Sequence, residues 1–547
     1  MFYPWFVLDS LNGFLIPAIS LFFVLTLLYS SRFMRANRNT FQYYIYIILT
    51  AVASLGAVLS NNLILLLVFW GFLGLTLYLL ISMGDGASSL VAKKTFIIVG
   101  GSDALMLLGI GIIYYLTQNL QMDAIRIELN NSLAILAYLC IAVAGFAKAG
   151  AMPFHSWIPD CAESASVPVV AFLPASLDKL LGIYLLARIS LNLFVMNPAM
   201  NIFLMFIGAI TIIAAVMMAL VQHNMKRLLG YHAVSQVGYM VLGIGSGTPI
   251  GIAGGIFHML NHAIYKSCLF LDAGNVEYKT GTTDLDKLGG LSKSMPFTYL
   301  SCLVASLSIS GVPPFNGFVS KWMVYQGLIT LVGVTGYAVR VAAVLCLAAA
   351  MFGSGLTLAS FMKLIHATFL GRASNSQSRV NEAHWTMWLP CIVLSTLCVI
   401  FGVFANQIPL KYFILPAVQG VTFIGTWYAG LSTLMILTGL VLGILLFKVK
   451  GLAPVLRRDS AFTGGEGLAS EENRLTGTEF YNTIKEFGLF KNIYSKAEAG
   501  FFDIYEQGKN LVFGIGRFFQ YLHNGVLPTY LVWMLLGMLV LFLALLR

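Results

Sequence analysis

The stretch Lys148-Ala-Gly-Ala-Met-Pro-Phe-His-Ser-Trp-Ile-Pro-Asp160 decides how the rest of the chain is interpreted. It follows the uncharged apolar run 133–145 and brings a lysine, a helix-breaking Pro-Phe-His and an aspartate to a depth where the chain should still lie in lipid. Broken helices with ionisable groups are tolerated at that depth only where protein or a water-filled cavity surrounds them. Such a place is typical of an ion path.

The composition agrees with a membrane location. Of the 547 residues, 59% are hydrophobic and only 10% are charged, whereas soluble domains carry about 25% charged residues. We therefore predict an all-α polytopic membrane protein. The net charge of +10 is attributed to loops that face anionic lipid or an acidic partner protein, and no nucleic-acid partner is expected.

The cysteines and glycines give no sign of a cofactor. Seven cysteines lie in or beside apolar segments, and none of them forms a CxxC pair. No Gly-rich phosphate loop or dinucleotide motif follows a strand pattern. Neither a cofactor nor a metal site is predicted.

Apolar segments of about 20 residues predict about 14 transmembrane helices. Two of them are predicted to be broken, one near Pro153 and one at Pro313-Pro314. The segments lie near 8–30, 41–60, 62–82, 95–117, 132–165, 167–189, 201–221, 231–247, 250–272, 296–333, 337–362, 386–406, 426–447 and 527–546.

Basic residues follow the odd-numbered segments, so all of them should lie on one side of the membrane. They are Arg32, Arg35, Arg38, Lys93, Lys94, Lys226, Arg227, Lys287, Lys293, Lys363, Arg372, Arg379, Lys448, Lys450, Arg457 and Arg458. The positive-inside rule then predicts cytoplasmic basic loops and two outward-facing termini. The expected location is the plasma or inner membrane.

An internal repeat is visible around the two breaks. Gly150-Ala-Met-Pro-Phe-His155 is similar to Gly311-Val-Pro-Pro-Phe-Asn316. Paired broken segments are typical of transporters built from inverted repeats with a site at mid-membrane depth. The predicted divisions are N-terminal helices 1–60, two inverted five-helix repeats 61–190 and 200–365, helices 386–447, a cytoplasmic amphipathic or lateral segment 448–526, and a terminal span 527–547. An ordinary loop with two short helices is the alternative for 448–526.

Lysines inside the predicted spans are the main candidates for function, namely Lys148, Lys179, Lys266 and Lys321. A lysine at the centre of a membrane helix costs about 2.5–3.5 kcal/mol on insertion scales, so it needs water or an acid beside it. A lysine whose acidic partner moves can take up and release a proton. For Lys148 and Lys321 the alternative is that the ammonium group snorkels to the membrane surface.

His258, His262 and Lys266 are spaced four residues apart, so they share one helix face. Histidine can donate and accept at once near neutral pH, which suits proton hopping between water molecules. Zinc binding by the two histidines is the competing interpretation, but the His-Glu-x-x-His motif is absent.

The remaining candidates for the proton path also have structural alternatives. His155 could hydrogen-bond a carbonyl freed by the helix break. Asp160 and Glu163 could cap the next helix segment, and Lys226 could anchor a loop edge. Asp178 and Lys179, as sequence neighbours, should point in different directions on a helix.

Several blocks of the sequence together indicate a family. They are Lys148 to Asp160 with Glu163, the run Lys179-Leu-Leu-Gly-Ile-Tyr-Leu-Leu-Ala-Arg188, the block Lys226 to Tyr239, Phe257 to Lys266, Asp284 to Gly290, and Gly317-Phe-Val-Ser-Lys321. These blocks resemble the antiporter-like subunits shared by respiratory complex I, energy-converting membrane hydrogenases and multisubunit cation/proton antiporters. The segment before the last span resembles that of the larger complex I subunit with a lateral helix.

The resemblance implies a subunit that translocates protons or sodium ions within a redox-driven membrane complex. It implies a path through Lys148, the His258/His262/Lys266 face and Lys321. It also implies other membrane subunits and lipid as direct partners, peripheral Fe–S subunits as indirect ones, and no redox cofactor in this chain.

Two departures from the family pattern affect the first half of that path. The family has a glutamate after a tryptophan as the partner of the central lysine, but Gly71 follows Trp70 here. The family histidine six residues after Pro168 is Pro174. We therefore expect Asp103 to be the replacement acid. The alternatives are a non-conducting scaffold subunit, or an ion-coupled membrane partner of a soluble enzyme that hydrates inorganic carbon.

Overall fold

The computed structural model describes residues 5–35, 39–84, 86–334, 336–371, 380–425, 428–448, 478 and 482–546. The predicted polar stretch 449–477 lies outside these ranges. So do six of the predicted loop charges, Arg38, Arg372, Arg379, Lys450, Arg457 and Arg458. The chain forms two compact units, Met1–Phe487 and Gly488–Arg547, and each is described by itself.

The first unit is a helical bundle. Its α-helices are α1 (Ser10–Gly13), α2 (Leu15–Phe33), α3 (Thr40–Leu59), α4 (Leu63–Ser82), α5 (Ser88–Thr117), α6 (Ser132–Ala149), α7 (Trp157–Ser164), α8 (Val167–Phe172), α9 (Asp178–Arg188), α10 (Pro198–Leu220), α11 (Met225–Gly245), α12 (Pro249–Thr280), α13 (Pro296–Ser310), α14 (Asn316–Val334), α15 (Tyr337–Ile365), α16 (Trp385–Val403), α17 (Ala429–Lys448) and α18 (Asn482–Glu486). Shorter elements are the 3-10 turn η1 (Met122–Ala124), the π turns η2 (Leu173–Leu177), η3 (Ile189–Leu193), η4 (His366–Leu370) and η6 (Asn406–Ile414), and the paired parallel strands β1 (Ile127–Glu128) and β2 (Phe194–Val195).

The second unit contains α19 (Gly488–Glu498), α20 (Ile504–Leu522) and α21 (Leu527–Leu545). The periodicity of α20 places apolar side chains such as Leu511 and Phe518 along one face, and none of the residues of α20 or α21 is buried. A strongly amphipathic helix of this kind is typical of a membrane surface or a groove between partner helices.

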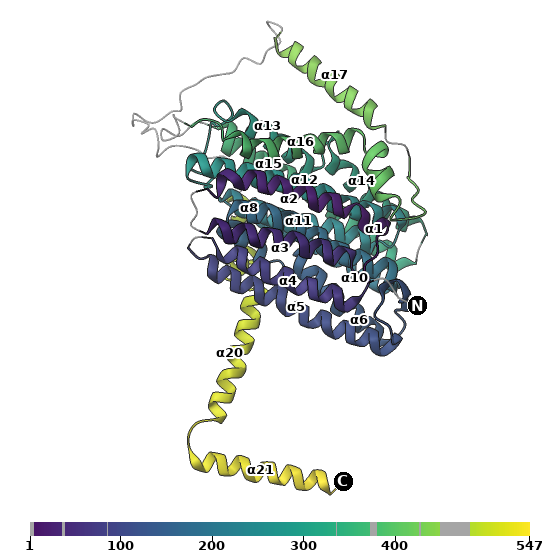
Figure 1. The fold of residues 1–547 in the computed structure, drawn as a ribbon, viewed down its shortest axis with the longest axis vertical. Helices are drawn as coiled ribbons and strands as arrows, with labels where there is room; N and C mark the ends of the chain where they lie inside the picture. The colour runs from purple at the N-terminus through teal and green to yellow at the C-terminus, as the bar shows by residue number, and fades with distance from the viewer. Residues whose placement is uncertain are drawn as a thin grey trace. The chain divides into compact units, whose positions relative to one another are not determined.

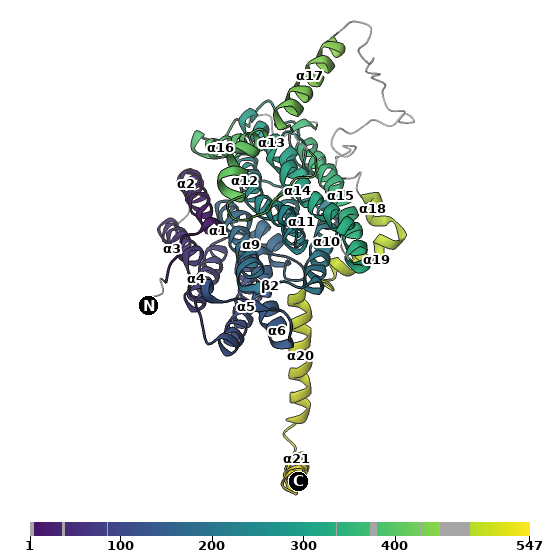
Figure 2. The same ribbon diagram turned by 90° about the vertical axis from the view of Figure 1, so that its right-hand side faces the viewer.

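Helix α12 lies at the centre of the bundle. Figure 1 shows α2, α3, α4 and α5 side by side on one flank, and Figure 2 shows the same bundle turned by a right angle. Helix α12 packs against α11, α13, α14 and α16, and it is buried along most of its length. Lipid solvates apolar side chains as well as protein does, so burial of a polar helix in a membrane bundle points to function.

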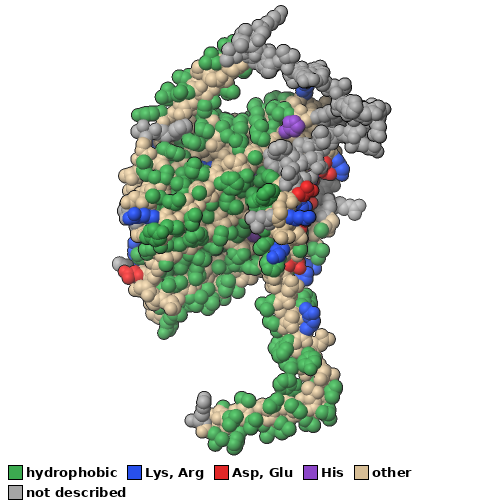
Figure 3. Space-filling model, turned by 180° about the vertical axis from the view of Figure 1, so that it is seen from behind, with side chains coloured by type: hydrophobic (Ala, Val, Ile, Leu, Met, Phe, Trp, Pro, Cys, Tyr) green, Lys and Arg blue, Asp and Glu red, His purple; other side chains and the backbone are tan. Residues whose placement is uncertain are grey.

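Ten of the described helices are long and apolar enough to cross a membrane. This supports a polytopic membrane protein but not the predicted number of about 14. Helix α12, with 32 residues, is not among the ten because its histidines, lysine, asparagines and aspartate lower its mean hydropathy. Figure 3 shows a broad face of the first unit covered by hydrophobic side chains, with charged side chains toward its edges.

Both predicted helix breaks are present. Helix α6 ends at Gly150 with φ of +81°, and α13 ends at Gly311 with φ of +80°. Each glycine is in the left-handed region that closes a helix, where a side chain would be strained. Lys148 precedes the first break, whereas Lys321 follows the second, so the two lysines do not occupy equivalent positions. The inverted relation between the two halves remains a prediction.

Ion pairs join several helix ends at one end of the bundle. Lys94 at the start of α5 pairs with Asp160 of α7 at 2.7 Å, and Arg227 at the start of α11 reaches the same carboxylate at 3.2 Å. Lys226 pairs with Glu277, near the end of α12, at 2.8 Å. Three of the predicted loop charges, Lys94, Lys226 and Arg227, therefore lie at one end, which we call the basic end of the bundle.

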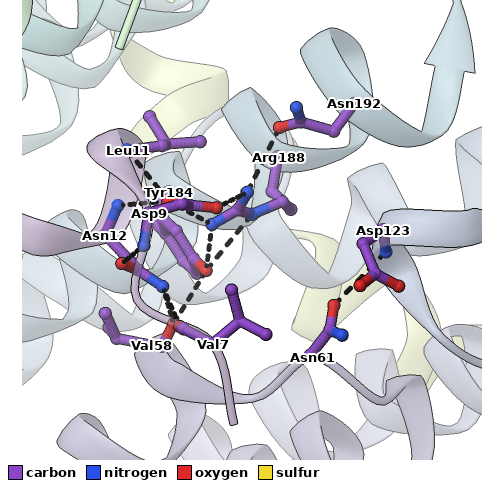
Figure 4. A network of polar contacts seen from close by, with 10 residues as sticks. All are labelled: Val7, Asp9, Leu11, Asn12, Val58, Asn61, Asp123, Tyr184, Arg188 and Asn192. Atoms are coloured by element: carbon purple, nitrogen blue, oxygen red, sulfur yellow. Dashed lines mark hydrogen bonds and ion pairs between the residues drawn. The ribbon is translucent and has the colours of Figure 1, made fainter. Parts of the chain in front are cut away.

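An ion-pair network fixes the opposite end of the first unit (Figure 4). Arg188, at the end of α9, donates to both carboxylate oxygens of Asp9 at 2.5 and 3.1 Å. It also donates to Tyr184 at 3.0 Å, and Asp9 accepts from the backbone of Leu11 and Asn12 at the start of α1. Burial opposes ionisation of Asp9, but the hydrogen bonds and charge of Arg188 outweigh it and hold its pKa below the ordinary value.

Replacing Asp9 by asparagine should lower the stability of the chain by about 1 kcal/mol at neutral pH, since Asp9 is partly exposed. A lowered pKa gives stability that is fully present above the unfolded-state pKa and is lost as the pH falls through the folded-state pKa. The difference in Tm between wild type and Asp9→Asn should therefore shrink below about pH 4. Thermal unfolding of the purified full chain in detergent would measure it, and a difference that does not change with pH would contradict the assignment.

Candidate functional site

The first buried cluster centres on Lys148, in the last turn of α6. Its ammonium Nζ lies 4.0 Å from Asp178 Oδ1, and both side chains are almost completely inaccessible to solvent. The same nitrogen lies 4.8 Å from the centre of the Trp70 ring. Asp178 is therefore the acid that the structure places next to Lys148, and it was not among the predicted site residues.

A π turn explains why sequence periodicity misses Asp178. The backbone N–H of Asp178 donates to the carbonyl of Leu173, five residues earlier, within η2. Pro174 lies in this turn and has no N–H to continue an α-helical ladder. The wider turn rotates α9 relative to α8 and changes which residues face α6.

Lys179 reaches the first helix break from the other side. Its Nζ lies 5.7 Å from the centre of the Trp157 ring. A Cβ atom placed on Gly150 would lie 3.5 Å from Lys179 Nζ. Lys148 and Lys179 therefore approach the break at Gly150 from α6 and α9.

The predicted replacement acid Asp103 lies on α5, half-buried, and near enough to attract the Lys148 ammonium. Its Oδ2 lies 3.6 Å from where a Cβ atom on Gly74 would be, so it faces α4. Gly71 is exposed, and a Cβ atom there would meet nothing within 4 Å. A glutamate at position 71 would thus point away from Lys148, which differs from the family pattern inferred from sequence.

The second buried cluster is on α12. His258 Nδ1 lies 2.9 Å from Ser320 Oγ, and His258 Nε2 lies 3.0 Å from Gln236 Oε1. The ring of His262 packs edge-on against Tyr265, and the amine of Lys266 lies above Phe270 and Phe361. All three predicted residues are completely buried, as expected for one helix face directed into the bundle.

Lys321 lies on α14, which packs against α12. Its Nζ donates to the carbonyl of Ile309 at 2.8 Å and to Ser354 Oγ at 3.0 Å, and it lies 4.6 Å from the centre of the Tyr239 ring. Ser320, the neighbour of Lys321, bonds His258. Ser320, the residue before Lys321, thus links His258 of α12 to α14, and the path itself remains a prediction.

Several of these buried groups lack a hydrogen-bond partner among the described residues. They are Lys148 Nζ, Lys179 Nζ, Lys266 Nζ, both carboxylate oxygens of Asp178 and both ring nitrogens of His262. Buried polar groups are nearly always hydrogen-bonded, by protein or by ordered water. A set of unpartnered ionisable groups in one bundle therefore fits a hydrated path better than a structural core.

The other predicted residues fall into two groups. His155 is buried beside the first break. Asp160, Glu163 and Lys226 lie at the basic end, where Arg227 Nη1 pairs with Glu163 Oε2 at 2.9 Å. Asp160 is half-buried and Glu163 is exposed, and Lys226 is buried but pairs with the half-buried Glu277. These ion pairs lie at the basic end and do not include the lysines of the two clusters.

His232, on α11, was missed as a site residue. Its Nε2 lies 2.7 Å from Ser360 Oγ, and its ring packs on Phe361, which also contacts Lys266. The signal was present, because His232 lies within the block Lys226 to Tyr239 that carries the family resemblance. His232 could have been recognised as a titratable side chain within a helix that is buried on all sides.

The chain matches one family model. Residues 60–369 match the model described as NADH:quinone oxidoreductase/Mrp antiporter, TM. This region includes both helix breaks and both buried clusters.

Two curated relatives illustrate the sequence similarity. The chain is 30% identical to an Na(+)/H(+) antiporter subunit of Alkalihalophilus pseudofirmus over 86% of its length and 63% of that protein. It is 30% identical to Hydrogenase-4 component B of Escherichia coli over 74% of its length and 63% of that protein. The chain therefore spans less than two thirds of each of these relatives.

The fold is also found in a solved respiratory complex. A chain of the membrane-bound sulfane sulfur reductase, an archaeal respiratory membrane complex, superimposes with a TM-score of 0.80 at 23% identity. The alignment covers 98% of this chain and 89% of the other. The likeness extends to the fold alone.

Proposed function

This chain belongs to the NADH:quinone oxidoreductase/Mrp antiporter membrane family, and from that premise we propose that it translocates protons, or sodium ions, as an antiporter-like subunit of a multisubunit redox-driven membrane complex. Support comes from relatives named as a hydrogenase component and as an Na(+)/H(+) antiporter subunit. The observation that carries the proposal is the set of buried, unpartnered ionisable groups around Lys148 and along α12.

The proposed path begins at Asp178 and Lys148. When the complex weakens this ion pair, Lys148 releases its proton to water held near the break, and Lys179 accepts it. His262 and Lys266 pass the charge along α12 to His258. His258 bonds Ser320, next to Lys321. Each step moves one proton between a nitrogen and water. The cycle closes when Lys148 takes up a new proton from water and Lys321 releases one to water at the other end of the path.

The environment of the path favours this chemistry. Both lysines of the first cluster lie beside aromatic rings, which attract a cation without binding it by a fixed hydrogen bond. Water can exchange with such an amine more easily than with one locked in a short ion pair. Asp103 is a second acid near Lys148, and its role as replacement acid belongs to the same proposal.

The proposed setting is a plasma or inner membrane with the basic end in the cytoplasm and other membrane subunits around the bundle. Two inverted five-helix repeats, 61–190 and 200–365, would each supply one break and one lysine. The two sequence arguments for a non-conducting scaffold are Gly71 and Pro174. Because position 71 is exposed, an acid there would not reach Lys148, so its absence is no longer an argument for the scaffold. No feature of the described residues favours a partner enzyme that hydrates inorganic carbon.

Replacing Lys321 by methionine should slow ion translocation at least tenfold, because it removes the only titratable group of that side chain while keeping its length. A tenfold change corresponds to about 1.4 kcal/mol in the barrier. The complex would be reconstituted in vesicles with an internal pH dye and, separately, a sodium dye. The exposed Lys287→Met at the basic end is the matched control.

Two outcomes of that experiment decide the proposal. A loss of the dye response in an assembled Lys321→Met complex, with Lys287→Met active, supports translocation by this chain. Wild-type translocation by an assembled Lys321→Met complex supports the scaffold instead. The dye that responds identifies the ion.

A further inference from the structure

A second polar stripe runs along α12, on a different face from His258, His262 and Lys266. Its members are spaced by four, three, four and three residues, so they lie in one line on the helix. They are Asn261, Tyr265, Cys268, Asp272 and Asn275, and all are completely buried. This face of α12 meets α13 and α16, which lie beside it in Figure 1.

The stripe connects to the basic end of the bundle through paired side chains. Glu382, half-buried before α16, accepts from Thr298 Oγ1 at 2.7 Å, and Asn275 donates to the same hydroxyl at 3.3 Å. One helical turn deeper, Ser301 Oγ donates to Asp272 Oδ1 at 2.7 Å. Two polar contacts between α12 and α13, Asn275–Thr298 and Asp272–Ser301, thus lie between Glu382 and Asp272.

The stripe continues inward past Asp272. Cys268 Sγ lies 3.5 Å from Asp272 Oδ2. Tyr265 lies about one helical turn from Cys268 on α12. Its Oη is 3.3 Å from His258 Nε2. The stripe therefore joins the proposed ion path at His258.

We propose that Asp272 is a proton-binding residue of a second conduit, which leads from Glu382 at the basic end of the bundle along α12 to His258. This inference rests on the proposed function of ion translocation. In this conduit Glu382 takes a proton from the aqueous side, Asp272 accepts a proton arriving by way of water and the hydroxyls, and Asp272 then releases it toward His258.

The alternative is that the stripe only holds helices together. Hydroxyl and amide groups suffice for that purpose in membrane bundles and contribute about 0.6–2 kcal/mol each. Asp272 is a carboxylic acid, which costs more to bury than an amide of the same shape and adds nothing to helix packing that an amide would not. An ionisable group at this position is explained by proton binding.

A bound metal cation fits Asp272 less well than a proton. The neighbours that reach the carboxylate are the Ser301 hydroxyl and the thiols of Cys268 and Cys391, which are hydrogen-bond donors to it. A sodium ion needs several oxygen lone pairs directed at it. The arrangement is that of a carboxyl group that exchanges a proton.

The test uses the full chain in its complex in vesicles, with Asp272→Asn. Asparagine keeps the acceptor for Ser301 and the side-chain shape but cannot titrate. We expect proton translocation to slow at least fivefold and Asp272→Glu to restore most of it. Infrared difference spectra between acidic and alkaline buffer should also lose a carboxylic C=O band in Asp272→Asn. Thr280→Val is the control, since that hydroxyl bonds Val276 and Thr282 at the end of α12 and is not part of the stripe.

Ser301→Ala keeps the carboxylate and removes its hydroxyl donor, so it tests the conduit in a second way and should also slow translocation. Wild-type rates in both Asp272→Asn and Ser301→Ala would overturn the inference, as would a loss of Tm with an unchanged rate per assembled complex. If Lys321→Met is inactive while Asp272→Asn and Ser301→Ala translocate at the wild-type rate, only the conduit is rejected. If Lys321→Met also translocates normally, the proposed function itself fails.

Discussion

Replacing Asp178 by asparagine is expected to slow ion translocation at least tenfold while the chain still assembles. Asp178 Oδ1 lies 4.0 Å from Lys148 Nζ, and neither carboxylate oxygen has a hydrogen-bond partner among the described residues. Its loss therefore removes the nearest acid that stabilises the charged form of Lys148 without breaking a hydrogen bond that holds helices together. Asparagine has the same shape, so packing around α9 is kept.

The change acts through charge, and the measurements should show this. A neutral residue 178 leaves the Lys148 ammonium with Asp103 and the Trp70 ring as its nearest attractive groups. Removing one partner of a buried ion pair costs about 3–5 kcal/mol when the other remains charged. Lys148 avoids that cost by staying neutral and so cannot carry a proton. Dye-reported translocation in vesicles, at equal amounts of assembled complex, is the measurement.

Asp160→Asn is the matched control for Asp178→Asn. Asp160 is an acid of the same type at the basic end, paired with Lys94 and Arg227 and away from Lys148. It should change the rate by less than about twofold, because exposed ion pairs contribute little. Asp103→Asn tests the second acid, and a larger effect there than in Asp178→Asn would reverse the order of the two acids.

A double variant tests whether residue 71 faces away from Lys148, as in the structure, or toward it, as the family pattern implies. Adding Gly71→Glu to Asp178→Asn restores the family residue after Trp70. The structure predicts no recovery, because position 71 is exposed and its Cβ direction meets nothing within 4 Å. Recovery of translocation would show that α4 is rotated in the assembled complex and that position 71 faces Lys148.

Sequence patterns predicted the features that depend on local chemistry. The breaks predicted near Pro153 and at Pro313-Pro314 are present, and the helices end a few residues earlier, at Gly150 and Gly311. The spacing of His258, His262 and Lys266 placed them on one buried face, as the structure has them. The family assignment is confirmed by the match over residues 60–369.

The missed features depend on geometry that spacing does not encode. Asp178 faces Lys148 because a π turn containing Pro174 changes the phase of the helix, and no fixed period of 3.6 residues describes that step. The ten helices that are long and apolar enough to cross a membrane do not confirm the predicted number of about 14, and α12 is outside the ten because of its polar residues. Polar residues on such a helix lower its hydropathy although it lies inside the bundle.

The same reasoning explains Asp272. A single aspartate in the apolar run after Lys266 looks like an interruption of a span. Its partner Ser301 becomes visible only when α13 is placed against α12, whereas Cys268 lies four residues earlier on α12 itself. Contacts between helices, and not the order of residues, therefore decide which buried polar groups belong to a path.

Replacing Gly238 by leucine should prevent stable folding of the first unit. Gly238 of α11 and Gly208 of α10 form a close helix crossing, and a Cβ atom on Gly238 would lie 2.6 Å from the carbonyl oxygen of Gly208. That neighbour is backbone and cannot rotate away. Small residues at such crossings let membrane helices approach closely. The close contact is stabilised by dispersion forces, because the hydrophobic effect does not drive helices together within lipid. We expect a loss of about 3 kcal/mol, at the upper end of overpacking effects.

Gly355→Leu is the matched control, because Gly355 of α15 is exposed and a Cβ atom there would meet nothing within 4 Å. Both variants add the same side chain to a membrane helix, so any general effect of leucine on insertion is shared. The yield of monodisperse full-length chain in detergent, and its Tm, should fall strongly for Gly238→Leu and stay close to wild type for Gly355→Leu. Equal behaviour of the two variants would mean that α10 and α11 do not cross at Gly208 and Gly238, and the position of α11, which supplies Gln236 and Tyr239 to the path, would then be wrong.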